Sequence, residues 1–523
     1  MVLAAIVVGL GLGAAEAGYD GGLAAYERGD YALALTEWRP LADKGLAAAQ
    51  NNLGLLYSQG QGIARDEAAA AGWFRRAAEA GHTLAQFNYG VALANGAGVA
   101  RDLDAAAAWY QRAAAAGHVP AQYNLALISS DPRRAAEWYT RAAEAGHAPS
   151  QYNLAVLLSQ GVERDLPRAL ALYRRAAEAG HALAQYNLGV AYATGAGVPR
   201  DGVEAMRWYR AAAGGGVSAA KFNLGVMLQE GEGAPRDARA AVELFRQAAE
   251  DGLAAAQFNL ALAYSQGRGT PTDPTAAVLW YRRAAEQGYA LAQHNLAVAY
   301  SEGRGLPKDA AQAVQWFRRA AEAGHLGAQF NLGLAYATGA GVAEDRAVAA
   351  AWYRRAAEEG LPEAQFNLAV LNAEGEGIAA DPAAAIDWYT RAAEQGHAKA
   401  QVNLGYALAA GLGVARDLAQ TATWYRRAAE SGHATAQYNL GVIYAAGEGV
   451  PQDFATAIDW YRRAAAQGHA QALFNLGVLT AQGRGIERDP GEAARWYRQA
   501  ADRDSAEAMN NLAIAYAAGE GVA

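Results

Sequence analysis

Histidine is the residue whose type and spacing first suggest a metal or proton-transfer site in this chain. Eight of the nine histidines occupy the same turn position of a recurring pattern, and they are His82, His118, His147, His181, His325, His397, His433 and His469. Consecutive members are one or more repeat steps apart, and three of the seven intervals are 36 residues. We therefore expect a ladder along one edge and not a cluster with metal-ligand geometry. The ninth, His294, replaces an aromatic residue. We therefore predict structural histidines and no metal site.

A serine and a lysine form the next candidate. Ser218-Ala219-Ala220-Lys221 matches the S-x-x-K motif of penicillin-recognising enzymes. The S-D-N and K-T-G elements of those enzymes are absent, and Lys221 stands where other repeats have glutamine. The chain also has no cysteine, which removes thiolate metal sites and cysteine nucleophiles. The sequence therefore predicts no catalytic residues.

Glycine pairs and arginine pairs could bind anions. The segments Gly60-Gln61-Gly62 and Gly447-Glu448-Gly449 follow a predicted helix and not a strand, and no Lys-Ser/Thr comes after them. Loop geometry explains them better than a phosphate cradle, and no cofactor is predicted. The arginine pairs, such as Arg354-Arg355 and Arg426-Arg427, are interpreted as a solvated helix face.

An asparagine recurs through the chain and defines a repeat. It occurs at positions 52, 88, 124, 153, 187, 223, 259, 295, 331, 367, 403, 439, 475 and 511. Eleven of the thirteen intervals are 36 residues, and the other two are 29 and 34. The period predicts an all-α solenoid, or superhelix, of about fourteen helix-loop-helix repeats. The two short intervals predict a local change of curvature between Leu125 and Asp165.

The repeat from Ala328 to Gly360 illustrates the expected elements. A first helix presents Leu332 and Tyr336 on one face, with Gly333 beside them as a notch for a neighbouring backbone. The loop 339–342 supplies glycines for left-handed positions, and Asp345 is the expected N-cap of the second helix. A loop of about six residues is expected between the two helices.

Tryptophan marks the second helix, where all twelve lie in an aromatic pair. The first slot of that pair holds Trp73, Trp109, Trp138, Trp208, Trp280, Trp316, Trp352, Trp388, Trp424, Trp460 and Trp496, and Trp38 is in the second slot. Leu172 and Leu244 fill the first slot in two further repeats. We interpret the tryptophans as core residues.

Composition limits the partners and the compartment. The 523-residue chain has a formal net charge of -8, so nucleic acid is not expected as a partner. Residues 1–17 resemble a signal peptide that ends in Ala15-Glu16-Ala17, although no basic residue precedes the apolar run. No integral membrane segment is predicted. The chain is expected to be exported, either periplasmic or secreted.

The repeat resembles that of the Sel-1-like repeat family, a relative of the tetratricopeptide repeat with a longer glycine-containing loop. The resemblance covers residues 46–523, where the last repeat lacks a second helix and is interpreted as incomplete. Residues 18–45 look like one tetratricopeptide-type pair that would cap the array.

Positions that vary between repeats are where specificity for a ligand is expected. The candidates four residues before the asparagine include Leu84, Leu183, Leu291, Glu363, Lys399, Thr435 and Gln471, and those seven residues after it include Glu230, Glu302 and Glu374. Both series should face away from the leucine and tyrosine of the first helix, toward the concave side. The turn histidines are expected to lie apart from this groove. The residue before each asparagine is usually Phe or Tyr, such as Phe366, and these rings either pack on the adjacent repeat or form a ligand ladder. The asparagines themselves bond a neighbouring helix or a ligand backbone.

A repeat array without catalytic residues, and the family resemblance, favour a binding function. We expect a scaffold that binds a protein or peptide segment in its concave groove, in bacterial cell-envelope assembly or signalling. The resemblance also permits a periplasmic protein associated with glycan or exopolysaccharide. A hydrolase acting on β-lactams or peptidoglycan is the weakest of the three hypotheses.

Overall fold

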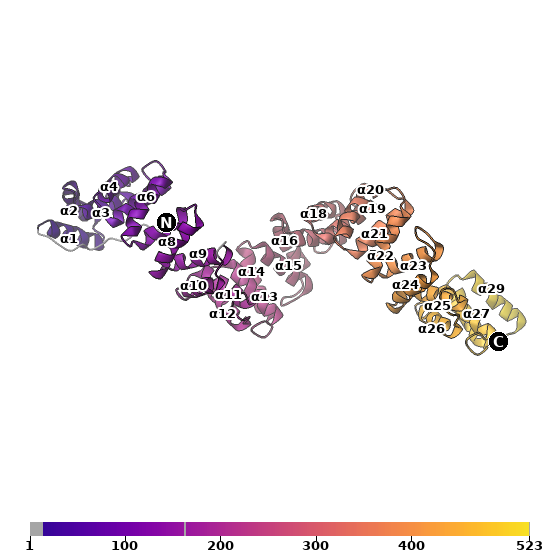
Figure 1. The fold of residues 1–523 in the computed structure, drawn as a ribbon. Helices are drawn as coiled ribbons and strands as arrows, with labels where there is room; N and C mark the ends of the chain where they lie inside the picture. Colours follow the sequence, from indigo (N-terminus) through magenta and orange to yellow (C-terminus); the bar gives the residue numbers. More distant parts are fainter. Residues whose placement is uncertain (1–13, 162–163, 522–523) are drawn as a thin grey trace. The chain divides into compact units, whose positions relative to one another are not determined.

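The structure, a computed structural model, describes residues 14–161 and 164–521, which form helices and no strand. The chain divides into two compact units, residues 1–251 and 252–523, and each unit is treated separately. Within each unit, consecutive helices pack on one another in chain order (Figure 1).

The first unit contains α1 (Ala14–Glu27), α2 (Tyr31–Asp43), α3 (Ala47–Gln59), α4 (Glu67–Glu79), α5 (Thr83–Asn95), α6 (Leu103–Ala115), α7 (Val119–Ile128), α8 (Pro132–Glu144), α9 (Ala148–Gln160), α10 (Leu166–Glu178), α11 (Ala182–Thr194), α12 (Gly202–Gly214), α13 (Ser218–Glu230) and α14 (Ala238–Glu250).

The second unit contains α15 (Ala254–Gln266), α16 (Pro274–Glu286), α17 (Ala290–Glu302), α18 (Ala310–Glu322), α19 (Leu326–Thr338), α20 (Arg346–Glu358), α21 (Pro362–Glu374), α22 (Pro382–Glu394), α23 (Ala398–Ala410), α24 (Leu418–Glu430), α25 (Ala434–Ala446), α26 (Phe454–Ala466), α27 (Ala470–Gln482), α28 (Pro490–Ala501) and α29 (Ala506–Ala518). The odd-numbered helices are the first helices of the repeats, and the even-numbered helices are the second.

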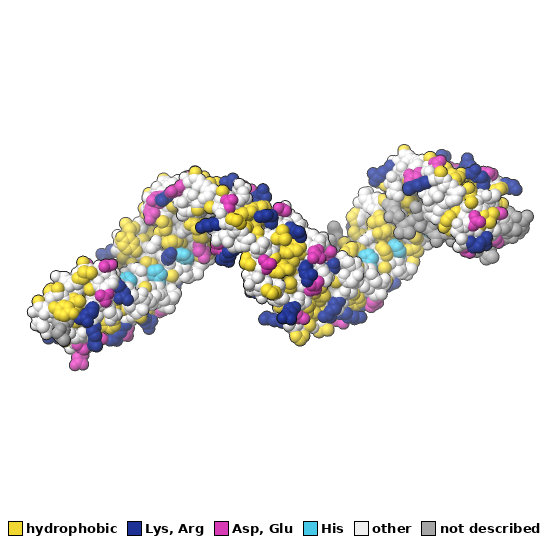
Figure 2. All heavy atoms as spheres, turned by 180° about the vertical axis from the view of Figure 1, so that it is seen from behind, with side chains coloured by type: hydrophobic (Ala, Val, Ile, Leu, Met, Phe, Trp, Pro, Cys, Tyr) yellow, Lys and Arg dark blue, Asp and Glu magenta, His cyan; other side chains and the backbone are white. Residues whose placement is uncertain are grey.

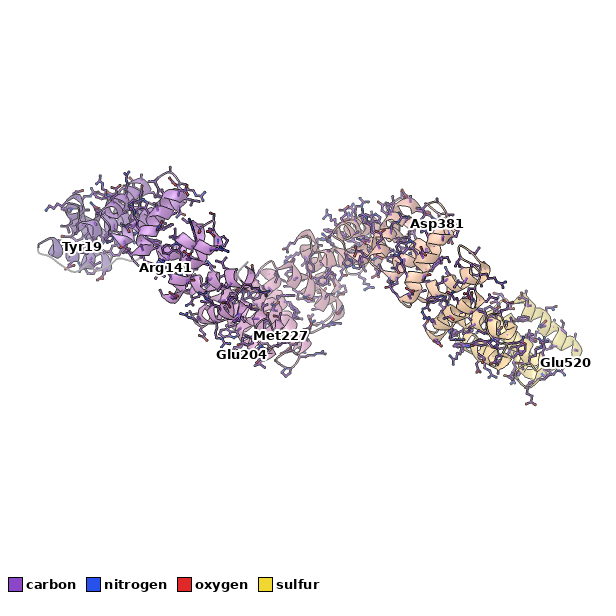
Figure 3. All side chains as sticks on the ribbon, viewed as in Figure 1. Tyr19, Arg141, Glu204, Met227, Asp381 and Glu520 are labelled. Carbon is purple, nitrogen blue, oxygen red and sulfur yellow. The ribbon has the colours of Figure 1, made fainter. Side chains whose placement is uncertain are left out.

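The expected helix caps are confirmed. α19 ends at Gly339, whose φ of 70° places it in the left-handed region. α20 begins after Asp345, whose side chain accepts a hydrogen bond from the backbone N–H of Val348. Seven residues, 339–345, separate the two helices, one more than the predicted loop. Asp381 caps α22 in the same way (Figure 3).

The second glycine of the loop allows two repeats to approach each other. Gly341 has a φ of 78°, and a Cβ atom added there would lie 2.2 Å from the carbonyl oxygen of Ala310, at the start of α18 in the preceding repeat. A side chain cannot occupy that space, because the obstacle is backbone. The loop therefore packs directly on the preceding second helix.

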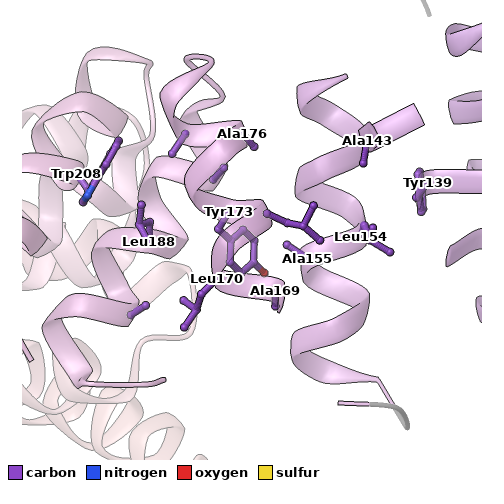
Figure 4. Packing of buried hydrophobic residues seen from close by; sticks show 14 of the residues in the cluster. Tyr139, Ala143, Leu154, Ala155, Ala169, Leu170, Tyr173, Ala176, Leu188 and Trp208 are labelled. Atoms are coloured by element: carbon purple, nitrogen blue, oxygen red, sulfur yellow. The ribbon is translucent and has the colours of Figure 1, made fainter. Parts of the chain in front are cut away.

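The second aromatic slot, and not the first, forms the centre of each repeat's core. The ring of Tyr353 lies against Gly333, where an added Cβ would be 2.7 Å from the ring. The notch in the first helix thus receives a side chain of the second helix, whereas we expected a neighbouring backbone. In the first unit, Tyr173 of α10 lies between Ala155 of α9 and Leu188 of α11 (Figure 4).

Most tryptophans pack against the repeat cores, as predicted, but they are only partly buried. Trp38 is fully buried and Trp208, Trp280 and Trp316 are 7–9% exposed, whereas the other tryptophans are only partly buried. An arginine one turn later covers the exposed face of the ring, as Arg355 does 4.6 Å from the centre of Trp352. Such a cation–π contact contributes about 0.5–1 kcal/mol at an exposed site.

The arginine pairs are therefore more than a solvated face. The second arginine of a pair covers the tryptophan, and the first reaches the next helix. Arg318 donates a hydrogen bond to the Tyr336 hydroxyl over 2.8 Å, and Arg426 donates to that of Tyr444 over 2.7 Å. Arg318 and Arg426 thus each link a second helix to the first helix of the next repeat.

The two shorter intervals alter local structure in the first unit. α7 has only 10 residues and ends at Ser129 in an extended conformation, without the left-handed glycine of other repeats. Gly161, after α9, is also extended. The change of curvature expected between Leu125 and Asp165 stays a prediction.

The predicted signal peptide lies in a part of the chain that is only partly described. Residues 1–13 of the expected signal peptide lie outside the described residues, and α1 begins at Ala14. Of the helices that are described, none combines the length and the apolar character needed to cross a membrane.

The turn histidines are part of the stack. Nδ1 of His397 accepts the backbone N–H of Ala400 over 3.2 Å, which caps α23, and its ring centre lies 4.8 Å from that of Phe366. His118 caps α7 and packs on Phe87 in the same way. Histidine thus acts as both N-cap and ring partner, as the structural interpretation predicts.

Loop glycines should resist substitution. We expect Gly341→Ala to lower the free energy of unfolding by about 2 kcal/mol or more, because alanine is strained at positive φ and its Cβ would overlap backbone. Gly72→Ala is the control, since that helical glycine has open space around its Cβ position, and it should stabilise by about 1 kcal/mol. Denaturant titration and amide hydrogen exchange measure both. Equal effects of the two changes would contradict the packing described for Gly341.

Acid should destabilise the stack. Burial lowers the pKa values of all nine histidines below their usual range. The unfolded chain therefore takes up protons more readily than the folded chain as the pH falls below about 6.5, so the histidine contribution present above that pH is lost. Melting temperature should drop by several degrees between neutral pH and pH of about 5. Replacing His82, His118 and His181 by Asn keeps an N-cap acceptor without titration, and should reduce this drop. An unchanged drop would exclude these histidines as its cause.

Candidate functional site

One side of the first helices brings the predicted ligand positions together. Relative to each repeated asparagine, residues at −4, −1, 0, +3 and +7 follow the spacing that places side chains on one face of a helix. We call the surface made of these positions the asparagine face. In α21 it comprises Glu363, Phe366, Asn367, Val370 and Glu374.

The asparagines at the centre of this face hold the repeats together. Asn403 donates a hydrogen bond to the Tyr389 hydroxyl over 3.1 Å, and Asn153 makes the same bond to Tyr139. Each bond joins a first helix to the second helix of the preceding repeat. Burial raises the pKa of Tyr425 to about 12, and the bond from Asn439 opposes this shift. The tyrosine hydroxyl stays protonated, and the side-chain N–H of the asparagine is used by the bond inside the stack. The internal role of the asparagine is therefore favoured over capture of a ligand backbone.

The aromatic residues before the asparagines are also engaged internally. Phe366 packs on Tyr389 with ring centres 6.0 Å apart, and on His397 at 4.8 Å. Tyr438 makes the corresponding contacts with Tyr461 and His469. These rings are therefore only half-buried, and neighbouring rings cover part of their surface.

The structure explains the S-x-x-K motif without catalysis. Nζ of Lys221 lies 2.6 Å from a carboxylate oxygen of Asp251, and the hydroxyl of Ser218 donates to the same oxygen over 2.6 Å. These bonds lower the pKa of Asp251, the lysine bond contributing most. Elsewhere a pair of glutamines bridges the same positions, as Gln365 and Gln395 do over 2.9 Å. Both side chains are therefore held by one carboxylate, that of Asp251.

Metal and phosphate chemistry find no support in the residues that are described. None of their histidine, aspartate and glutamate side chains form a group of three able to hold a metal ion. The glycine loops face the preceding second helix, as at Gly341 and Ala310, so their backbone does not form an open cradle.

Most of the predicted ligand positions are exposed. Leu84 is half-buried, whereas the other nine positions are exposed, and they are Leu183, Leu291, Glu363, Lys399, Thr435, Gln471, Glu230, Glu302 and Glu374. Leu84, Leu183 and Glu230 belong to the first unit, and the rest belong to the second. Glu302 is paired with Arg304.

The expected separation between histidines and groove is wrong. His397 and His433 line the same pocket, of about 410 Å³, as Glu363 and Lys399. The reason is that the turn histidine and the −4 residue are close to each other along the chain. A turn histidine caps the first helix two residues before the −4 position, so its ring lies beside that side chain.

An apolar stripe on the asparagine face was missed from the sequence. The residue three positions after every repeated asparagine is aliphatic or aromatic, and it lies one turn beyond the −1 aromatic. In the second unit Leu334 is 41% exposed, Tyr406 61% and Val442 37%. Its position relative to the asparagine could have identified the stripe. Figure 2 shows apolar side chains and histidines at the surface of one face of the molecule.

A second, larger pocket lies in the first unit. It measures about 470 Å³ and is lined by residues of α8 and α9, including Pro132, Ala136 and Leu157. It adjoins residues 162–163, which lie outside the described residues.

Comparison with known protein families identifies the repeat. The sequence model of the Sel1 repeat matches residues 47–82, 83–118, 119–147, 148–181, 182–217, 218–253, 254–289, 290–325, 327–361, 362–397, 398–433, 434–469, 470–505 and 506–523. No match is found among curated proteins.

Solved structures of related repeat proteins agree with the family model. c5321, a protective antigen present in uropathogenic Escherichia coli strains and displaying an SLR fold, is 34% identical, with 85% of this chain and 90% of that chain covered and a TM-score of 0.68. A Sel1 repeat protein from Oxalobacter formigenes is 35% identical, with 59% of this chain and 90% of that chain covered and a TM-score of 0.49. The chain therefore belongs to the Sel1 repeat family, with matched repeats from residue 47 to residue 523.

Proposed function

We propose that the chain is a non-catalytic scaffold that binds a protein or peptide segment along the asparagine face. The observation that carries this proposal is the exposed apolar stripe, represented by Leu334, Tyr406 and Val442. Exposed apolar side chains that are contiguous and bordered by polar residues mark interaction surfaces. Sel1 repeat proteins are typically interaction scaffolds, which agrees with this use.

The border of the stripe supplies specificity. Glu363, Lys399, Thr435 and Gln471 occupy the same position in four successive first helices and differ in charge and size. Because all four are exposed, a segment crossing α21, α23, α25 and α27 would meet a different polar group in each repeat. Such a sequence of groups selects one partner over another through differences in affinity.

Two other functions are less well supported. Glycan binding would use a row of exposed aromatic rings, whereas this face exposes Tyr406 but packs Phe366 and Tyr438 on tyrosine and histidine neighbours. Hydrolysis of β-lactams or peptidoglycan would need a free serine and lysine, but Ser218 and Lys221 are both bonded to Asp251. A binding role for protein is therefore favoured.

The proposed setting is the bacterial cell envelope. Two observations support it: the apolar residues 1–17 resemble a signal peptide, and the related repeat proteins come from Escherichia coli and Oxalobacter formigenes. Assembly or signalling at the envelope would use a scaffold of this kind.

The apolar stripe should carry partner affinity. Replacing Leu334, Tyr406 and Val442 together by Ser should weaken binding of a purified partner roughly tenfold or more, because apolar area that is removed from water on binding is lost. The partner is identified by crosslinking in an envelope fraction, and its affinity is then measured by calorimetry. Circular dichroism checks that helicity is unchanged.

A matched control tests whether the loss of affinity comes from this surface or from any replacement of exposed apolar residues by serine. Leu103, Val203 and Leu279 are exposed apolar residues on second helices, and replacing these three by Ser should leave affinity nearly unchanged. If the control loses the partner while the stripe variant retains it, the binding face has been assigned to the wrong helices.

A further inference from the structure

Ring pairs recur along the asparagine face of the second unit. The aromatic residue before the asparagine packs on the histidine that ends the same repeat, with ring centres 4.8 Å apart for Phe366 and His397 and 4.6 Å apart for Tyr438 and His469. Nδ1 of these two histidines accepts a backbone N–H, from Ala400 and from Ala472 respectively. Each imidazole is thus held by a ring and by a helix N-terminus.

Repeat 398–433 breaks this pattern. Val402 replaces the ring, and an aromatic residue appears one helical turn later as Tyr406, which is 61% exposed. His433 consequently has no ring from its own repeat beside it. Its Nδ1 atom is buried without a hydrogen-bond partner, whereas Nδ1 of each other turn histidine in the described chain has one.

A pocket that His433 lines lies beside this repeat. The space of about 410 Å³ is lined by Phe366, Asn367, His397 and His433, together with Glu363 and Lys399. That volume falls within the range of small-ligand pockets, which is about 300–1,000 Å³. The rings of Phe330, Phe366, His397 and His433 therefore line one space.

Two opposite charges border the pocket. Glu363 belongs to α21 and Lys399 belongs to α23, so they lie in successive repeats. Both are exposed, and no ion pair joins them among the residues that the structure describes. A segment that crosses α21 and then α23 therefore meets a negative group followed by a positive one.

We propose that this pocket binds one aromatic side chain of an extended peptide, with a basic group beside Glu363 and an acidic group beside Lys399. The proposal rests on the proposed scaffold function and names its partner chemistry. Tryptophan and tyrosine fit best, because their rings can pack on the rings that line the pocket while their N–H or O–H stays in water.

The decisive variant makes this repeat resemble its neighbours. Val402→Phe restores the ring found in α21 and α25. That ring should pack on His433, as Phe366 packs on His397, and so narrow the pocket while preserving or raising thermal stability. The probe is a library of short blocked peptides whose central residue is Trp, Tyr, Phe, Leu or Ala, flanked by Lys, Asp or Ser. The full chain should bind the best tryptophan or tyrosine peptide roughly tenfold or more tightly than its alanine counterpart. Val402→Phe should abolish that preference.

A charge exchange tests the flanks by a change of specificity, which loss of folding cannot produce. The wild-type chain should prefer Lys on one side of the aromatic residue and Asp on the other. The double variant Glu363→Lys with Lys399→Glu should prefer the reverse order and retain the preference for an aromatic centre. Thr435→Lys, at the equivalent position of the next-but-one first helix from Glu363, is the control and should leave the order unchanged.

The possible outcomes test the pocket proposal and the scaffold proposal separately. If peptides bind without preference for an aromatic centre, or if Val402→Phe keeps that preference, the pocket proposal fails while a binding surface remains. If no library peptide binds, the pocket proposal also fails, and the scaffold function is then decided by the partner titration with the Leu334, Tyr406 and Val442 variant.

Discussion

A pair of thirteen-residue helices has too little surface between its two members to bury both apolar faces, and this limit governs the structure. α19 and α20 cover Tyr353 between them by means of the space at Gly333. The opposite faces of the same helices become buried only when neighbouring repeats pack on them. The loop at Gly341, the bond from Asn403 to Tyr389 and the histidine caps all lie at contacts between repeats. These contacts fix which side chains remain available for a partner.

Much of the fold follows from the sequence because its signals are local. Left-handed glycines such as Gly339 and capping aspartates such as Asp345 act within a few residues, so the helix boundaries could be predicted. The depth of burial could not, because it depends on which residue covers a ring. Trp352 resembles a core residue until Arg355 is seen to lie over its exposed face.

The candidate surface was predicted in part. Variation between repeats identified Glu363 and Lys399, and the structure places both at one pocket. Their neighbours His397 and His433 were assigned to a separate edge, because the turn and the first helix were treated as different surfaces. A turn histidine precedes the −4 position by only two positions in the chain, as His397 precedes Lys399. The exposed stripe that contains Leu334 and Tyr406 was not predicted from the sequence, for another reason. A position that is always apolar looks the same in a sequence whether a neighbouring repeat or a partner covers it.

The close contact between each loop and the preceding second helix also bears on how such a chain can change in length. Gly305 meets Pro274, Gly341 meets Ala310 and Gly377 meets Arg346 through backbone atoms, at positions that are one period apart. A recombination event that inserts or removes one whole period joins surfaces of the same shape, and the backbone contact is rebuilt whichever side chains flank it. Gain or loss of a different number of residues would separate the glycine from its place. Duplication in units of 36 residues is therefore the route by which this architecture can lengthen, and each new copy brings a further −4 position on which selection can act.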